Sequence, residues 1–578
     1  MIIGMLSGIR RNILVVIFVS SLAMIPIYIR SLLYFDTNPL IFRLAHLVSI
    51  VCISLILVGV GWRASARTRA LLVIAWVLVL RFMIPLRLDE GIVSNYPDMI
   101  YETQIADKIL ASGAVSFQSP TTYGVDYVFN PMLELLVANL GMVLGVPLAP
   151  VLKYIGPFLG VLTVIFLLGF YRGFLDDKTA VISVFLAASC FHFLRFDSGT
   201  VHETLALVFF SMILYSLPRA GAAWRSLSVV AAFMLVSTHF FTSVVAFFNF
   251  LAASALILIL PGMLGRGLDR IQRSILGLPM MMLGLVILWY SYIASEMLRI
   301  AFHLGQEVIL VFMSTWQAIF PLSPPSAAGV SVWVRIVGDI SVVAFALTAS
   351  LGVWAIVVMK KHRAERSALP LAAASGMTFI IGLVLYTKLA TTTDLLPRTF
   401  IYLYFLGAPL SLLGIRELSL RGGDIRGPTN RSLLICAALI ALVAIGSTYY
   451  NYPQFLYDNT SPLNFEDVRL PLEDWKSAGL FARDHVSQNA AVWGDKIAFS
   501  FVGGYAQREV SLFPRELRTS LVDFTRSYVP HGDTIILRKS MPYVPYLDYQ
   551  TDGQQFQGIV EEANAFYSSA DVVMIVER

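Results

Sequence analysis

The sequence predicts an all-α polytopic membrane protein with about 13 transmembrane helices and a small extracytoplasmic α/β domain at its C-terminal end. Of its 578 residues, 57% are hydrophobic and only 14% are charged, and the mean hydropathy is +0.74. An average soluble domain has about 45–50% apolar and about 25% charged residues, so this composition excludes a soluble enzyme. The charges are also uneven, since residues 450–578 hold 11 Lys or Arg and 17 Asp or Glu, against 31 and 20 in residues 1–449.

Long apolar runs predict the membrane body, because a helix of roughly 17 to 25 residues crosses about 30 Å of hydrocarbon and satisfies its own backbone hydrogen bonds. Thirteen such runs lie at about 12–30, 41–61, 69–86, 148–171, 178–194, 201–217, 225–240, 241–260, 273–293, 335–359, 368–388, 398–416 and 431–449. The first run predicts a retained anchor, since no small-residue cleavage site follows it cleanly. No real loop separates the runs at 225–240 and 241–260.

Lys and Arg in the loops predict the orientation of the chain. With Arg10 and Arg11 in the cytoplasm, the alternate loops on that side collect about 20 Lys and Arg, more than twice the number outside. This bias predicts a multi-pass membrane protein with a cytoplasmic N-terminus and an extracytoplasmic C-terminal domain. A bacterial or archaeal cell membrane fits a chain without organelle signals. The basic excess, with a pI of about 8.9, therefore reflects membrane orientation and indicates no nucleic-acid partner.

Two domains follow from these patterns. Residues 1–449 form the multi-span domain, which has long external loops at 87–147 and 294–334, and loops of this length usually carry function. Residues 450–578 alternate short apolar runs with helical stretches, which is typical of a small α/β domain. The apolar runs include 491–493, 534–537 and 572–576, and the clearest helical stretch is 472–486.

The first external loop carries the strongest chemical pattern. After Pro97, residues 98–110 have helical spacing, and Gly113 is a natural C-cap. Asp98 and Glu102 share one face of this helix, and the helix dipole favours a carboxylate in the first turn. Such a carboxylate can accept a proton from an attacking hydroxyl group. A polar helix start on a solvated loop fits the same residues. The apolar positions expected to lie on the bilayer are Ile100, Ile105, Ile109 and Leu110.

The order of these motifs resembles the GT-C superfamily of glycosyltransferases that use polyprenyl-phosphate or dolichyl-phosphate sugars, of the protein-mannosyltransferase and aminoarabinose-transferase type. The first external loop of that family has an Asp, an aromatic residue, an Ala and a Gly at a typical spacing. The corresponding residues here are Asp98, Tyr101, Ala106 and Gly113. Segments that resemble the family's next elements follow in order at 122–147, 156–174 and 197–215.

The sequence also departs from the family pattern. Many relatives have Glu directly after the Asp, whereas Met99 follows Asp98 here, so the second acidic partner is either Glu102 or missing. The C-terminal domain has only VWGD at 492–495 in place of the WWDYG signature of the oligosaccharyltransferase branch, so we do not assign the chain to that branch. Asp89 and Glu90 form the rival acidic pair for the general base.

The resemblance implies an inverting glycosyltransferase with a GT-C-like helical body, in which the external loop 87–147 is catalytic. Asp98 would be the general base, with Glu102 as a second catalytic carboxylate. The implied partners are a lipid-linked sugar donor, an extracytoplasmic acceptor and membrane lipid. No nucleotide-binding loop is visible, which suits a lipid-linked donor, and three cysteines within apolar runs indicate neither a disulfide framework nor a zinc site.

Cations near the external helix ends are candidates for binding the donor phosphate, because an unpaired phosphodiester near hydrocarbon is costly. Arg398, in the segment TTTDLLPRTF, resembles the late-helix Arg that contacts donor phosphate in relatives. A snorkelling anchor or an ion pair with Asp394 is the alternative. Lys388 and Arg195 are further substrate-binding candidates.

Ionisable residues at membrane depth are functional hypotheses by default. His202 and Glu203 lie at the external start of a predicted span, and His239 lies between two apolar runs. We include Glu203 and His239 among the substrate-binding candidates, although His239 could simply hydrogen-bond Thr238 or Thr242. A set of Asp98, Glu102 and Glu203 could hold Mg²⁺ or Mn²⁺ through oxygen ligands, so the sequence leaves metal dependence open.

Two other classes of function fit the same residues. A transporter or lipid flippase would line a substrate path with these charges, but it predicts charges near the bilayer midplane and repeat symmetry, whereas the candidates lie at external helix ends. A catalytically silent GT-C relative in cell-surface polysaccharide assembly would keep the fold without the chemistry. The neutral neighbour Met99 beside Asp98 is compatible with that second alternative.

Overall fold

The structure is a computed structural model, and it describes most of the helical body together with parts of the C-terminal region. The described residues are 2–31, 39–59, 64–87, 98–116, 129–259, 269–294, 332–358, 369–388, 395–420, 430–449, 472–487, 490–494, 511–512, 534–538, 564–568 and 572–576. Most of the loop predicted at 294–334 lies outside these ranges. So do Asp89, Glu90 and Asp394.

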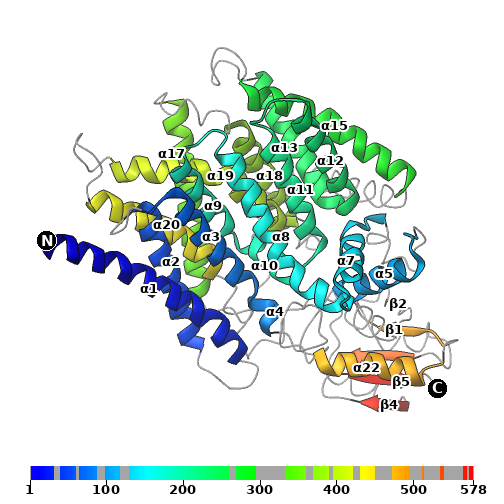
Figure 1. Cartoon of the computed structure of the whole chain (residues 1–578). Helices are drawn as coiled ribbons and strands as arrows, with labels where there is room; N and C mark the ends of the chain where they lie inside the picture. Colours follow the sequence, from blue (N-terminus) through cyan, green and yellow to red (C-terminus); the bar gives the residue numbers. More distant parts are fainter. Residues whose placement is uncertain are drawn as a thin grey trace.

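Helices form the body of the protein (Figure 1). In chain order they are α1 (Ile2–Ser31), α2 (Pro39–Val58), α3 (Ala66–Arg81), α4 (Met83–Arg87), α5 (Asp98–Ser112), α7 (Met132–Leu144), α8 (Leu148–Tyr171), α9 (Asp177–Ala188), α10 (Phe191–Gly199), α11 (His202–Ser216), α12 (Ala222–Thr238), α13 (Phe240–Ile259), α15 (Arg270–Tyr292), α17 (Val332–Val357), α18 (Leu369–Lys388), α19 (Leu395–Leu420) and α20 (Asn430–Tyr449). Most of their buried apolar side chains form one continuous core, and residues of α17, α18 and α19 form a second, smaller cluster.

The helical body is that of a membrane protein. Five helices are long and apolar enough to cross a bilayer, namely α8, α13, α15, most of α17 and most of α19. The other apolar helices, including α2, α11 and α20, are shorter within the described residues. The membrane class is thus confirmed, whereas the number of 13 spans and the orientation of the termini stay predictions.

Most helix ends lie within a few residues of the predicted apolar runs. α1, however, begins at Ile2 instead of residue 12, and the run predicted at 69–86 is divided into α3 and α4 at Phe82. The run predicted as a single span at 178–194 is wrong, because α9 ends at Ala188 and α10 begins at Phe191. Between them Cys190 has ψ 121°, which lies outside the helical region and breaks the hydrogen-bond ladder. The runs at 225–240 and 241–260 form two helices, α12 and α13, separated only by the extended residue His239.

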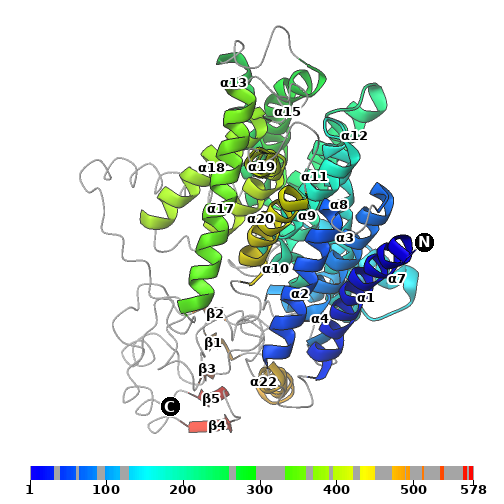
Figure 2. The same ribbon diagram turned by 90° about the vertical axis from the view of Figure 1, so that its left-hand side faces the viewer.

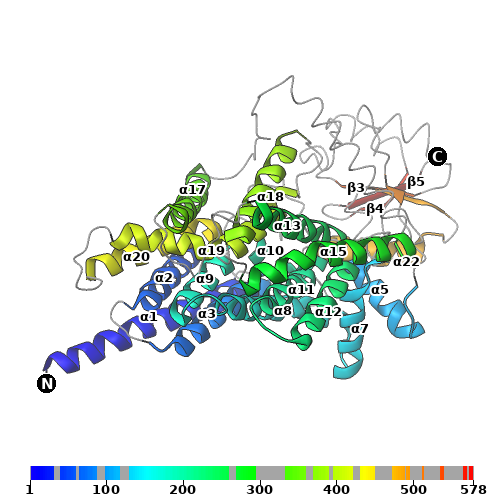
Figure 3. The same ribbon diagram turned by 90° about the horizontal axis from the view of Figure 1, so that it is seen from above.

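The two helices of the first external loop pack on the bundle. α5 spans Asp98–Ser112, and Gly113 ends it in the left-handed conformation with φ +68°, as predicted for a C-cap. α5 contacts α7 and α8, and these helices lie on the side of the body away from the start of α1 (Figure 3). Ile109 is therefore buried in the protein core rather than on the bilayer, whereas Leu110 is exposed as predicted.

A five-stranded sheet and one helix account for the described part of residues 450–578. The strands are β1 (Val492–Gly494), β2 (Ser511–Leu512), β3 (Thr534–Arg538), β4 (Asn564–Ser568) and β5 (Val572–Val576), in the order β2-β1-β3-β5-β4. β1 pairs in parallel with β2 and β3, and β5 pairs antiparallel with β3 and β4. α22 (Leu472–His485) contacts β5. Sheet and helix lie at the end of the body where α4 and α10 are found (Figure 2).

Small residues allow α17 and α19 to approach closely, and this is the most extensive helix pair in the body. A Cβ atom at Gly414 of α19 would collide with the Thr348 carbonyl oxygen, and one at Gly352 of α17 would collide with the Leu410 carbonyl oxygen. The Thr348 and Ser411 hydroxyl groups hydrogen-bond across the same contact at 2.7 Å. Backbone approach of this kind stabilises helix pairs in membranes, where the hydrophobic effect does not drive association.

We expect Gly414→Ala to lower thermal stability markedly, because the added methyl group meets backbone that cannot move aside. The matched control is Gly376→Ala in α18, where a Cβ meets nothing within 4 Å. Thermal unfolding of the two purified variants in detergent checks this. Equal unfolding temperatures for the Gly414→Ala and Gly376→Ala variants would show that the contact between α17 and α19 has room for an added methyl group.

Candidate active site

Two ionisable residues at the start of α11 organise the candidate site. Val201, the N-cap, is extended with φ −130° and ψ 167°, and His202 and Glu203 form the first turn of the helix. Successive helical residues point about 100° apart, so these two side chains enter different surroundings. Each of them is the centre of one charged cluster.

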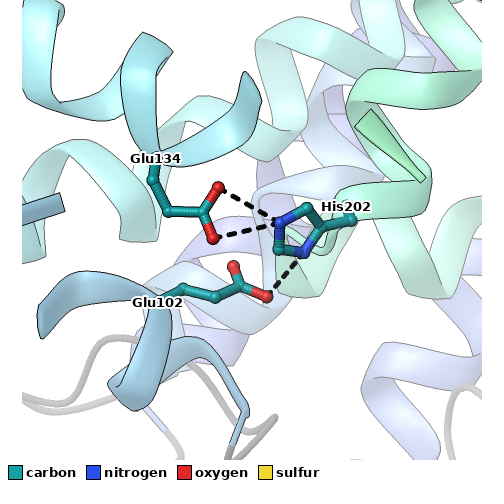
Figure 4. A group of neighbouring side chains, drawn as sticks. All are labelled: Glu102, Glu134 and His202. Carbon is teal, nitrogen blue, oxygen red and sulfur yellow. Dashed lines mark hydrogen bonds and ion pairs between the residues drawn. The ribbon is translucent and has the colours of Figure 1, made fainter. Parts of the chain in front are cut away.

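His202 lies between two carboxylates that come from the two helices of the first external loop (Figure 4). Its Nδ1 is 2.7 Å from Oε1 of Glu102 on α5, and its Nε2 is 3.1 Å from Oε1 and 3.2 Å from Oε2 of Glu134 on α7. All three residues are at most 3% exposed. The cluster therefore ties α5 and α7 to α11 inside the protein.

This geometry is satisfied either by a protonated His202 or by a bound metal ion. A carboxylate only accepts hydrogen bonds, so an imidazole between two of them must donate from both nitrogens and carries a positive charge. Alternatively, Glu102, Glu134 and His202 each offer one ligand atom within 4.8 Å of the others, which is close enough to hold a metal ion. A donor set that includes an imidazole suits Mn²⁺ or Zn²⁺ better than Mg²⁺.

Glu203 is the centre of the second cluster. Its Oε1 is 2.6 Å from Nη2 of Arg398, which lies in the first turn of α19, and 3.4 Å from Nε2 of His239. The Arg398 guanidinium also lies 5.2 Å from the ring centre of Phe241, a favourable cation–π distance. Arg398 keeps 26% of its side chain exposed, whereas the Glu203 side chain is only 9% exposed. The cluster thus pairs a partly exposed cation with a buried carboxylate.

Hydrogen bonds identify the tautomer of His239. Its Nδ1 accepts the backbone N–H of Thr242 at 3.1 Å and lies 2.7 Å from the Thr242 hydroxyl. Nδ1 is then the acceptor, so Nε2 carries the proton and faces Glu203. This contact with Thr242 is one of the alternatives that the sequence leaves open for His239.

A small pocket lies beside this second cluster. It is lined by Phe196, Glu203, Leu207, Phe241, Thr242, Arg398, Ile401 and Tyr402. As it stands, the pocket has room for about one water molecule. Its lining combines one carboxylate and one guanidinium with apolar or aromatic groups.

The turn before α11 is held in place by a fully buried ion pair. Arg81 Nε, at the end of α3, lies 2.7 Å from Oδ2 of Asp197 on α10, and neither side chain is exposed. Thr200 has φ +52°, an unfavourable value for a β-branched residue, and its hydroxyl accepts the N–H of Gly156 on α8 at 3.0 Å. These contacts set where α11 begins.

The structure brings some of the predicted site residues together and leaves others untested. Glu203, Arg398 and His239 meet in one cluster, and the observed partner of Arg398 is Glu203. Glu102 meets His202, whereas Glu203, which the sequence groups with Glu102 as a metal ligand, faces Arg398 instead. Asp98 begins α5, but its side chain and those of Lys388 and Arg195 lie outside the described part.

Glu134 is the site residue that sequence reasoning missed. It lies in MLELLVANL, where it is the one charged residue of an otherwise apolar helix, and that isolation was a usable signal. The sequence marks His202 as an ionisable residue at the start of a predicted span, but not as a site residue. Its role depends on two carboxylates from separate helices, and no local pattern shows that they converge on it.

Comparison with known proteins identifies the fold. No protein-family model and no curated protein sequence matches the chain. Among solved structures, it is similar to the oligosaccharyltransferase of Archaeoglobus fulgidus tethered with an acceptor peptide, with a TM-score of 0.53, 11% identity, and coverage of 88% of this chain and 74% of that chain. The apo form of that enzyme gives a TM-score of 0.52 at 10% identity, with the same coverage.

A weaker likeness, with a TM-score of 0.49 and 12% identity, is to ArnT from Cupriavidus metallidurans bound to undecaprenyl phosphate, covering 89% of this chain and 99% of that chain. The similarity to the archaeal enzyme confirms the GT-C fold that the motifs of the first external loop predict. At such low identity the comparison establishes the fold alone.

We expect His202→Leu to lower stability by about 3–5 kcal/mol, because it removes the cation that lies between the buried carboxylates of Glu102 and Glu134. Glu134→Gln keeps a hydrogen-bond acceptor beside the imidazole and should cost less. Chemical unfolding of the purified variants measures both. A metal assay on the same samples distinguishes the two cases. Stoichiometric Mn²⁺ or Zn²⁺ in the unsubstituted protein would show that a metal ion, rather than a protonated His202, links the two carboxylates.

Proposed function

We propose that this protein is an integral-membrane inverting glycosyltransferase that transfers a sugar from a polyprenyl- or dolichyl-phosphate carrier to an extracytoplasmic acceptor. The observation that carries the proposal is a partly exposed Arg398 above a carboxylate-lined pocket, within a fold similar to that of an archaeal oligosaccharyltransferase. The enzyme of Archaeoglobus fulgidus was solved with a tethered acceptor peptide. The acceptor of the present protein is a glycan, a lipid or a protein.

Arg398 is the candidate contact for the donor phosphate. A guanidinium has five N–H donors in a planar fork that suits phosphate oxygens, and 26% of the Arg398 side chain is exposed beside its ion pair with Glu203. Glu203 would hold Arg398 in place before the donor arrives, and the aromatic ring of Phe241 would support it from the side. When the sugar leaves the carrier, the phosphate gains negative charge, and a preorganised guanidinium stabilises that charge. Lys388 and Arg195 are the further cations proposed for this role.

Asp98 is the proposed general base. It would take the proton of the acceptor hydroxyl while the acceptor oxygen attacks the anomeric carbon and the bond from that carbon to the carrier phosphate breaks. The products are the inverted glycoside, a protonated Asp98 and the carrier phosphate. Its position at the N-terminus of α5 favours the ionised carboxylate before the reaction.

The cluster of Glu102, Glu134 and His202 supports this assignment through the position of α5. Because it fixes α5 against α7 and α11, it would determine where Asp98 stands relative to Arg398. Glu102 is therefore proposed as a positioning residue, in place of the direct catalytic role that the sequence suggests. If a metal ion occupies the cluster, these three residues hold it, and its contribution is charge neutralisation beside the site.

We expect Asp98→Asn to reduce sugar transfer by about 10²- to 10⁴-fold, because the amide cannot accept the acceptor proton. The assay uses membranes containing the full chain and labelled polyprenyl-phosphate sugars, and it measures label lost from the carrier. Asp107→Asn is the matched control, since Asp107 is an exposed carboxylate on the same helix. The Asp107→Asn variant should transfer sugar as fast as the unsubstituted protein.

Equal transfer by the Asp98→Asn and Asp107→Asn variants would assign the base to another residue, with Asp89 or Glu90 next to be tested. Absence of transfer by the unsubstituted, folded protein with every donor would refute the transferase and favour a transporter or a silent GT-C relative.

Substitution of Arg398 tests the phosphate contact. Arg398→Gln should reduce transfer by about 10²- to 10³-fold, with the loss mainly in kcat, because the lost charge acts on the leaving phosphate. Arg398→Lys keeps the charge but not the planar fork, so it should restore only part of the rate. Arg172→Gln is the control, since Arg172 forms an exposed ion pair with Asp177. A normal rate in Arg398→Gln would exclude Arg398 from the site.

A further inference from the structure

A second group of cations lies at the end of the bundle opposite the candidate active site. It consists of Arg69 on α3, Lys178 on α9 and Arg416 on α19. Arg398 and Arg416 lie at opposite ends of α19, about 27 Å apart along the helix axis at 1.5 Å per residue. Arg69 likewise lies near the start of α3, whereas Arg81, beside the active-site turn, ends it.

Arg69 is a buried cation that forms no ion pair within the described part of the chain. The residue is 6% exposed, and its Nε is buried without a hydrogen-bond partner. Removing a guanidinium from water without a partner is costly, so this arrangement indicates that an anion belongs there.

Two more cations lie near Arg69. Lys178 is within electrostatic range of both Arg69 and Arg416, and its Nζ donates to the Val58 carbonyl oxygen at the end of α2, 2.8 Å away. The ends of α2, α3, α9 and α19 therefore meet around these charges, and α9 contacts each of the other three helices. Three positive groups from three helices repel one another, and an anion bound between them would offset that repulsion.

Asp176, a carboxylate close to Lys178 and Arg416, is already engaged. It is the N-cap of α9, and its oxygens accept hydrogen bonds from the backbone N–H groups of Lys178 and Thr179 and from the Thr179 hydroxyl. Partial burial alone would raise the pKa of the Asp176 carboxyl, but these hydrogen bonds and the positive charge of Arg416 lower it below its usual value. Asp177 pairs with Arg172 at 2.9 Å. Asp176 therefore supplies at most one negative charge beside the three cations.

We propose that Arg69, Lys178 and Arg416 bind the phosphate of an anionic phospholipid headgroup at this end of the bundle. Basic pockets between the ends of membrane helices are suited to such headgroups. Leu71 and Leu418 lie two residues beyond Arg69 and Arg416 and are 65% and 41% exposed, so the outer faces of the same turns are apolar and meet hydrocarbon. The loop charges predict this face to be cytoplasmic, and the site does not depend on the proposed sugar transfer.

The experiment measures thermal unfolding of the purified full chain in a neutral detergent. The probes are dioctanoyl phosphatidylglycerol, dioctanoyl phosphatidylcholine and inorganic phosphate at equal concentrations. We expect phosphatidylglycerol to raise the unfolding temperature by several degrees and phosphatidylcholine to have no effect. The rise should disappear in Arg69→Gln and in Lys178→Gln. Arg67→Gln, which removes an exposed charge two residues away, is the matched control and should keep it.

Each outcome decides the proposal. Without lipid, Arg69→Gln should be at least as stable as the unsubstituted protein, because it removes a buried charge that forms no ion pair in the described part of the chain. An equal rise with phosphatidylcholine, or a rise that survives in both Arg69→Gln and Lys178→Gln, would overturn the site. A rise of the same size with inorganic phosphate would replace the lipid with a free anion. Lys178 is exposed, so its variant tests the site even if Arg69→Gln does not fold.

Discussion

The requirement that buried charges be paired determines the arrangement of this protein around the start of α11. His202 and Glu203 are adjacent in the sequence but contact different partners, and each contact joins helices that are distant in the chain. Without His202, the buried carboxylates of Glu102 and Glu134 would lose this positively charged partner, and α5 and α7 would lose their ion pairs with α11. The segment predicted to be the first external loop therefore contributes buried residues to the protein core.

α19 connects the two charged ends of the molecule. Its first turn supplies Arg398 to the pocket beside Glu203, its second half packs closely against α17 through Gly414, and its last turns supply Arg416 to the opposite cation group. α3 also carries charges at both ends. Arg81 at its end forms the buried ion pair with Asp197 of α10, and Arg69 lies near its start. These helices thus place charged groups at the two ends of the bundle.

Much of the helical body could be predicted because hydrophobicity and length are local properties. α8 begins and ends at the predicted residues, and Gly113 ends α5 as expected. The division between α9 and α10 could not be predicted, since the run from Lys178 to Leu194 is largely apolar and no local pattern marks the break at Cys190. Ile109 lies in the core rather than on the bilayer because α5 packs against α7 and α8, and that packing is not visible in the sequence.

The sequence by itself determined that this is a membrane protein, where most of its helices lie, and which family's fold it resembles, because these depend on composition, spacing and the order of motifs along the chain. Tertiary structure decided which charges meet: Arg398 with Glu203, and His202 with Glu102 and Glu134. A buried ionisable group needs a partner, but the sequence does not say which one. That choice depends on how helices from separate parts of the chain pack, and a short-range interaction such as an ion pair forms only after packing has brought its two groups within a few ångströms.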